Sequence, residues 1–446
     1  MNGARILLVI AMAVPVLAAN MAHADDLPRP SVYGLYAWCS GYVQYAEDIQ
    51  RTGIRWVRVG GWLDRQTDEA ALLAAANGVH LTPTLFLRDL SHDRTMPIDE
   101  ALVQWRQHVR RSVERYGPGG TLWKEHPDAP ALPIRYWEIW NEPNIEFLTP
   151  PEGMTRAELY ARLLKAASEE IRALDPGAQI VAFNVAGGTP KSSPPVDGIW
   201  QRLKYFGWRR FIREVTEAAG TDCYDCFGTH PYTRPLGPEK GGVIEGLEML
   251  AELAAEQGTK DKTVWFTEVG FPTIYPRNQQ VKDEREQACF LVRLFAVAAA
   301  HNVAQVQVMF VADITYGPDG STRAFGFFTA PGQWRPQAEA TRVMMRLLPE
   351  PRDGAEVLSE EADGVFAYRF RGADGRPVIM AWTCGEEPVE RAFDVDGDAV
   401  TIVDYLGGVR EATVQNGQVR VELSDAPVYL VAAPAARVRE VLGGSE

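Results

Sequence analysis

The sequence predicts an α/β protein, a (β/α)8 TIM barrel followed by a small antiparallel β-domain. Three observations support this prediction. The chain has 446 residues, of which 46% are hydrophobic and 23% charged, an ordinary balance for a globular protein with more than one domain. Eight short apolar runs alternate with stretches of helical periodicity. After about Pro349 the helical periodicity gives way to short alternating segments separated by turns.

The first 24 residues have the pattern of an export signal. Arg5 supplies a positive charge, Ile6 to Ala19 form an apolar stretch, and Ala22-His23-Ala24 is a small-x-small cleavage site. The apolar stretch is shorter than the roughly 20 residues that a membrane span needs. We therefore predict a signal peptide over residues 1–24, cleaved before Asp25, and a periplasmic or secreted protein. An uncleaved membrane anchor is the alternative, and membrane association is expected only in that case.

The barrel is predicted over residues 25–349. Alternation of strands with helices favours parallel pairing, and eight such units fit a (β/α)8 barrel. A doubly wound open sheet is the alternative, but the first strand is not followed by a Gly-x-Gly-x-x-Gly turn. The clearest helix follows Thr155-x-x-Glu158, which has the form of a capping box. The strands are expected at residues 31–36, 56–59, 81–87, 136–140, 179–184, 226–229, 263–267 and 305–311.

A small β-sandwich-like domain is predicted over residues 350–446. Phe366, Tyr368 and Phe370 alternate with smaller or charged residues, as in a strand with one buried face. No catalytic pattern occurs in this region, and we expect it to cover one side of the barrel. Turn signals separate its strands at Asp374-Gly375, Asp396-Gly397, Gly407-Gly408 and Asn416-Gly417.

Charge and residue inventory exclude several functions. With 45 Lys and Arg against 59 Asp and Glu, the net charge is −14, which argues against nucleic acid and anionic lipid as partners. Seven histidines form no His-x-His pair and no His-Glu-x-x-His run, so we predict neither a metal nor a cofactor. Cys223 and Cys226 lack a second pair for a zinc site and are expected to be buried thiols or one local disulfide.

Two glutamates stand where predicted strands end. Glu142 closes the fourth strand in Trp140-Asn141-Glu142-Pro143, and Glu268 closes the seventh in Thr267-Glu268-Val269-Gly270. Because active sites of such barrels lie at the carboxyl ends of the strands, both side chains are expected at one mouth. A pair of carboxylates suits glycoside hydrolysis, in which one protonates the departing oxygen and the other attacks or stabilises an oxocarbenium-like centre.

The two carboxyl groups need different protonation states at one pH, so their surroundings must differ. Trp137, Trp140 and Pro143 are expected to desolvate Glu142 and keep it protonated. Arg58, which ends the second strand, is expected to hold Glu268 ionised, although a plain structural ion pair is an alternative role for this arginine.

These motifs resemble those of the clan A retaining glycoside hydrolases, the 4/7 barrel superfamily. The similarity spans roughly residues 31–348 and also includes Trp56-Val-Arg58, Asp225 to Tyr232, and Ala324 to Phe328 followed by Arg335-Pro336. Within the clan the chain is most similar to family 39 and to related glycosidases of exopolysaccharide gene clusters.

The resemblance implies that Glu142 is the acid/base and Glu268 the nucleophile. It further implies that Asn141 binds the sugar 2-hydroxyl, that Arg58 and Tyr232 orient Glu268, and that His230 lines the pocket. A core histidine is the alternative for His230. One departure concerns the end of strand eight, where many clan members have Trp and this chain has Phe310.

Aromatic residues complete the predicted substrate site, with Trp140 and Phe310 among them. Trp38, Trp62, Trp200 and Trp208 are expected on loops at the mouth, either stacking on sugars or packing beneath the loops. The long insert Gly187–Gly207 is expected to wall an open groove.

The function predicted is an exported retaining β-glycosidase that hydrolyses a polysaccharide, with endo action favoured. The two carboxyl groups are then expected to lie roughly 5 Å apart. A non-catalytic glycan-binding component of an assembly or export system is the alternative from another class. An exo-acting β-xylosidase, a uronidase-like enzyme and transglycosylation also remain open.

Overall fold

A computed structural model describes residues 27–61, 63–87, 97–187, 199–275, 280–316, 320–361 and 364–443. The predicted signal peptide lies outside these residues. Within them, no helix combines the length and apolarity that a membrane crossing needs.

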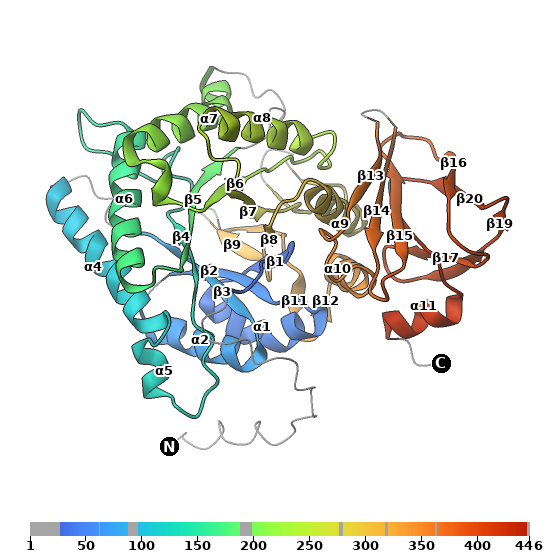
Figure 1. Ribbon diagram of the computed structural model, residues 1–446, viewed down its shortest axis with the longest axis horizontal. Coiled ribbons are helices and arrows are strands. Elements are labelled where there is room, and N and C mark those ends of the chain that lie inside the picture. The colour runs from blue at the N-terminus through green and yellow to red at the C-terminus, as the bar shows by residue number, and fades with distance from the viewer. Residues whose placement is uncertain are drawn as a thin grey trace.

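Eight parallel strands form a closed barrel in sequence order (Figure 1). The first strand pairs with both the second and the eighth, which closes the sheet. The predicted (β/α)8 barrel is confirmed, and the strand ends differ from those expected by at most three residues. The strands are β1 Tyr33–Tyr36, β2 Trp56–Gly60, β3 His80–Leu85, β4 Tyr136–Ile139, β5 Gln179–Ala186, β6 Cys226–His230, β7 Thr263–Val269 and β8 Gln305–Val308.

Helices surround the barrel (Figure 1). The capping box is present at the helix Arg156–Leu174, where the Thr155 hydroxyl accepts from the Glu158 amide and the Glu158 carboxylate accepts from the Thr155 amide. The helices are α1 Cys39–Thr52, α2 Arg65–Asn77, α4 Ile98–Tyr116, α5 Thr121–Glu125, α6 Arg156–Leu174, α7 Ile199–Ala219, η1 Thr221–Cys223, α8 Val243–Glu256, α9 Glu284–Ala300 and α10 Pro336–Leu347. Short strands follow β8, namely β9 Ile314–Tyr316, β10 Ser321–Arg323, β11 Phe328–Ala330 and β12 Gln333–Trp334.

The barrel interior is layered, apolar at the bottom and polar above. Trp56, Tyr136 and Trp265 pack against one another at the bottom, with ring centroids 5.1–6.1 Å apart. Alternate residues of a strand share a face, so two positions further along these strands Arg58 and Glu138 also point inward. Both are fully buried. Because inward and outward positions alternate along each strand, Arg58 and Glu138 lie at the floor of the mouth.

The C-terminal region forms two antiparallel sheets, in the strand orders β13-β14-β15-β21-β17-β18 and β16-β20-β19. The predicted antiparallel β-domain is confirmed. A small core that includes Ile379, Ile402 and Val421 lies between the sheets. The elements are β13 Glu356–Glu360, β14 Val365–Arg371, β15 Pro377–Thr383, β16 Val389–Asp394, β17 Val400–Asp404, β18 Val409–Ala412, β19 Val414–Gln415, β20 Gln418–Leu423, β21 Val428–Val431 and α11 Ala435–Leu442.

The larger sheet packs against the barrel beside α9 and α10 (Figure 1). Phe366, Tyr368 and Trp382 belong to the same buried cluster as the barrel core, which explains the alternation seen in this segment. The predicted boundary at residues 349 and 350 lies in the turn between α10 and β13, and the division into two domains stays a prediction.

The five cysteines are free. The Cys226 side chain points into the barrel bottom, and the Cys223 thiol donates to the Ala219 carbonyl. Of the two expectations for this pair, thiols rather than a local disulfide are observed.

Candidate active site

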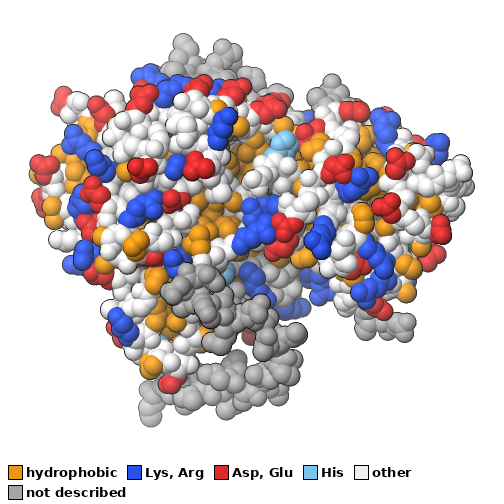
Figure 2. Space-filling view, in the orientation of Figure 1, with side chains coloured by type: hydrophobic (Ala, Val, Ile, Leu, Met, Phe, Trp, Pro, Cys, Tyr) orange, Lys and Arg blue, Asp and Glu red, His pale blue; other side chains and the backbone are white. Residues whose placement is uncertain are grey.

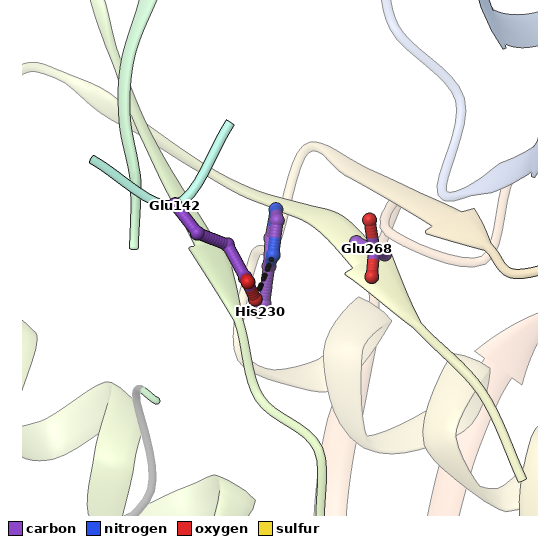
Figure 3. A group of neighbouring side chains, drawn as sticks. All are labelled: Glu142, His230 and Glu268. Carbon is purple, nitrogen blue, oxygen red and sulfur yellow. Dashed lines mark hydrogen bonds and ion pairs between the residues drawn. The ribbon is translucent and has the colours of Figure 1, made fainter. Parts of the chain in front are cut away.

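The carboxyl ends of the strands bring the predicted polar residues together at one mouth. Glu142 follows β4, His230 ends β6 and Glu268 lies near the end of β7. One oxygen of each carboxylate and a ring nitrogen of His230 all lie within 4.8 Å of one another. Figure 3 shows the Glu142 side chain reaching toward His230, with Glu268 approaching from its own strand. Each glutamate side chain is 14% exposed, so both are largely buried but still in contact with solvent.

Arg58 joins Glu268 to Asn141 and Glu138 from the floor of the mouth. Its Nη1 donates to Glu268 Oε2 at 3.0 Å, its Nη2 to Asn141 Oδ1 at 2.9 Å, and its Nε to Glu138 Oε2 at 2.8 Å. The Tyr36 ring covers the guanidinium, whose carbon lies 4.5 Å from the ring centroid. Since the guanidinium is a rigid planar fork, these bonds fix the relative positions of Glu268 and Asn141.

Glu138 is a site residue that the sequence analysis missed. It is fully buried on β4, where it accepts hydrogen bonds from Arg58 and from the Thr84 hydroxyl, the latter at 2.9 Å. The Gln307 amide, correctly oriented, donates to its other oxygen at 2.7 Å. Glu138 balances the charge of Arg58 and leaves the arginine's remaining donors for Glu268 and Asn141. The feature of the sequence that could have identified Glu138 is a glutamate inside an otherwise apolar strand.

Glu268 is held as a carboxylate. Burial by itself would raise its pKa, but the charges of His230 and Arg58 and hydrogen bonds from Tyr232 and Arg58 outweigh that effect and lower the pKa below its ordinary value. The Tyr232 hydroxyl donates to Oε1 at 2.6 Å. Burial, followed by the charge of Glu268, raises the pKa of Tyr232, so the phenol remains a proton donor. Glu268 is therefore ionised at neutral pH, as a nucleophile requires.

Glu142 has a different environment. Its Oε1 is hydrogen-bonded to His230 Nδ1 at 2.9 Å, and no arginine contacts it among the described residues. The His230 side chain is buried, and its Nε2 has no partner among the described residues. The two neighbouring carboxylates thus have different partners. Glu268 is bound by the Arg58 guanidinium and the Tyr232 hydroxyl, whereas Glu142 is bound by the His230 imidazole.

Local backbone irregularities aim both glutamates. Trp140 and Glu142 have φ of 67° and 45°, a left-handed conformation that costs roughly 1–3 kcal/mol for each non-glycine residue. The Glu142 amide donates to the Asn184 carbonyl at 3.0 Å, which holds this turn. In β7 the register against β8 shifts between Phe266 and Val269, and the shift turns Glu268 toward the mouth.

Asn184 is a second residue that the sequence analysis missed. Its side-chain nitrogen donates to the Trp140 carbonyl at 2.9 Å, so it supports the turn that carries Glu142. It lies across Gly228, where a Cβ would fall 1.9 Å from the Asn184 Oδ1. A glycine is therefore required on β6 at this position. The register of β5 against β6 shifts between Ala182 and Val185. The sequence pattern does not indicate this shift, so the position of Asn184 could not be predicted.

Trp38 and Phe310 form an aromatic edge of the mouth. Trp38 is 47% exposed, and its ring centroid lies 5.7 Å from that of the buried Phe310. Phe310 in turn packs on Tyr36 at 4.8 Å, the residue that covers Arg58. The exposed indole is thus anchored to the floor of the site, which suits it to stack on a sugar ring.

The other tryptophans do not all reach the mouth. Trp140 is 1% exposed, because its left-handed backbone turns the indole into the outer core beside Trp105 and Phe86. Trp137 is likewise buried in that core. Trp208 lies within α7 instead of on a loop and is buried. Trp62, residues 188–198 of the long insert, and the Trp200 side chain lie outside the described residues.

The same three groups could also surround a metal ion, since Glu142, His230 and Glu268 offer ligand atoms at suitable spacing. Their partners argue for a different use. Both oxygens of Glu268 already accept hydrogen bonds, and the Arg58 guanidinium 3.0 Å away opposes a divalent cation. The arrangement fits a carboxylate pair that acts directly on a substrate.

Comparison with known proteins gives the fold class. No protein family model matches the chain, and no curated protein matches it. Solved structures do match. A family 39 glycoside hydrolase from Bacteroides cellulosilyticus WH2 is 18% identical with a TM-score of 0.66, and the match covers 91% of this chain and 81% of that one.

Two further structures are similar over nearly their whole length. A monomeric β-xylosidase from Caulobacter crescentus CB15 is 14% identical with a TM-score of 0.59, covering 91% of this chain and 97% of that one. An α-L-arabinofuranosidase from Thermotoga maritima is also 14% identical with a TM-score of 0.59, covering 92% and 98%. The chain therefore shares the barrel and C-terminal β-domain of these glycoside hydrolases.

Proposed function

We propose that the protein is a retaining β-glycosidase that hydrolyses a polysaccharide by double displacement. The observation that carries the proposal is the close approach of Glu142 and Glu268, within 4.8 Å, in unlike environments. Retention goes with carboxyl groups about 5–5.5 Å apart, whereas inversion needs about 6.5–9.5 Å to admit a water molecule between them.

The proposed reaction has two steps. Glu268 attacks the anomeric carbon while Glu142, entering as an acid, gives its proton to the departing glycosidic oxygen. This breaks the glycosidic bond and forms a glycosyl-enzyme ester. Glu142 then takes a proton from water, whose oxygen attacks the anomeric carbon and releases Glu268. Asn141, fixed by Arg58, is available to bind a sugar hydroxyl beside the reacting carbon.

We further propose that the substrate is a polymer and that cleavage is internal. Support comes from the exposed Trp38 at one side of the mouth and from an open hollow of about 440 Å³ beyond Asn144. Met154, Arg210 and Phe211 also line this hollow. We propose that it seats sugar units on the acid/base side. Export of the chain, proposed from residues 1–24, would place the enzyme where such polymers are.

Incubation with a panel of polysaccharides and oligosaccharides, followed by sizing of the products, tests the proposal. For a cleaved polymer we expect mean chain length to fall sharply before monosaccharide appears. Monosaccharide as the main product from the first minutes would contradict internal cleavage and favour the exo-acting β-xylosidase-like alternative. Binding of polymers without any cleavage would favour the glycan-binding alternative.

A further inference from the structure

Arg234 presents a positive charge beside the site. It lies four residues after the end of β6 and is half-buried. Its guanidinium carbon lies 4.1 Å from the ring centroid of Tyr232 and 4.1 Å from that of Tyr275. Among the described residues no carboxylate pairs with it and no acceptor takes a hydrogen bond from it. Other arginines of the barrel differ, since Arg293 and Arg335 both form ion pairs.

A second arginine approaches from another loop. Arg323, at the end of β10, has its guanidinium carbon 5.0 Å from the Tyr275 ring centroid. Phe325 packs on Tyr275 at 5.8 Å and lies 5.6 Å from the Arg234 guanidinium. This grouping contrasts with the net charge of −14, which leaves the average surface acidic.

The position of Arg234 relative to the reacting groups is defined by Tyr232. One face of the Tyr232 ring carries Arg234, and its hydroxyl donates to Glu268 at 2.6 Å. The arginine is therefore separated from the nucleophile by a single tyrosine ring. In the double displacement the sugar held by Glu268 is the glycone, so Arg234 lies nearest to the glycone part of the substrate.

We propose that Arg234, assisted by Arg323, binds the carboxylate of an acidic sugar in the glycone part, so that the substrate is an anionic polysaccharide. A guanidinium pairs with a carboxylate through two parallel N–H donors, and stacking on Tyr232 and Tyr275 presents the Arg234 fork already oriented. The inference rests on the proposed function, because that function defines Glu268 as the nucleophile and hence which sugar lies near Arg234.

Carboxyl reduction provides a matched pair of probes. Glucuronoxylan, alginate, gellan and xanthan are each compared with the same polymer after its carboxylates are reduced to alcohols. Binding is measured by calorimetry on full chains carrying Glu268→Gln, and cleavage on chains with Glu268 intact. The variants are Arg234→Gln, Arg234→Lys and, on the separate β10 segment, Arg323→Gln. Arg420→Gln, which removes an equal charge from an exposed pair on the β-domain, is the control.

We expect at least one acidic polymer to bind more tightly than its reduced form. Arg234→Gln should weaken binding of the acidic form about tenfold or more, as loss of a charge-assisted pair does, and leave the reduced form unchanged. The quantity compared is the ratio of the affinity for the acidic polymer to that for its reduced form. Arg234→Lys should restore part of this ratio, Arg323→Gln should lower it, and Arg420→Gln should not change it. If Arg234→Gln does not fold, Arg323→Gln decides the question.

The outcomes separate this inference from the proposed function. Equal or tighter binding of every reduced polymer overturns the inference, as does a preference for acidic polymer that neither Arg234→Gln nor Arg323→Gln changes. Cleavage of neutral polymers alone leaves the glycosidase proposal standing and overturns the anionic substrate. Arginine-dependent binding of an acidic polymer without cleavage supports the arginine site and overturns the glycosidase proposal.

Discussion

Glu268→Ala is expected to abolish hydrolysis of every glycoside, by roughly 10⁵-fold or more, a range similar to the loss of a nucleophile in other covalent enzymes. Without the carboxylate no glycosyl-enzyme can form, whatever the leaving group. The loss should therefore appear equally with polysaccharide and with nitrophenyl glycosides. Initial rates with both substrates check this expectation.

Glu252→Ala provides the control for the nucleophile variant. Glu252 is an exposed glutamate of α8, so its replacement should leave the rates unchanged. Circular dichroism of Glu268→Ala guards against misfolding, because the change leaves Arg58 with one acidic partner fewer. Substantial activity of a folded Glu268→Ala protein on nitrophenyl glycosides would contradict the nucleophile assignment.

Glu142→Ala is expected to reduce hydrolysis of natural glycosidic bonds by about 10²–10⁴-fold, the usual contribution of general acid–base catalysis. With nitrophenyl glycosides, whose leaving group needs little protonation, the rate of glycosyl-enzyme formation should fall much less than it does with natural glycosidic bonds. Pre-steady-state release of nitrophenol measures that step, while turnover reports the slower water attack that has lost its base.

The contrast between the two variants is the test of the roles. Equal losses on both substrate types for Glu142→Ala would show that the residue does not protonate the leaving group. His230→Asn, which removes the imidazole from Glu142 but leaves Arg58 and Tyr232 on Glu268, should follow the Glu142 pattern at smaller amplitude.

Most of the fold was predictable because each strand is a short apolar run bounded by turn or helix signals. Parallel pairing followed from the alternation with helices, and closure into a barrel from the number of units. The positions of Glu142 and Glu268 followed from the same logic, since both stand where an apolar run ends. The contact between Arg58 and Glu268 was also anticipated and is observed at 3.0 Å.

What the sequence could not give depends on backbone irregularities and on the closed barrel interior. The left-handed backbone at Trp140 turns its indole away from the mouth, where it was expected, and no local sequence pattern predicts this conformation. The register shift in β7 changes which face Glu268 occupies. Glu138 on β4 contacts Arg58 on β2, which is 80 residues away in sequence and has β3 between it and β4, so the pattern of one strand does not indicate the contact.

The surface shows why overall charge was an incomplete guide to the substrate. Acidic and basic side chains are interspersed over the face seen in Figure 2, so the net charge says little about any one cleft. The arginines on Tyr275 come from two segments far apart in sequence, which meet only in the folded chain.

NMR of the first product formed from a β-glycoside tests the central claim most directly. The separation of Glu142 and Glu268 and the lowered pKa of Glu268 predict that the β-anomer appears first and then mutarotates to the equilibrium mixture. Initial appearance of the α-anomer would mean a single displacement by water and would contradict the assignment of Glu268 as nucleophile.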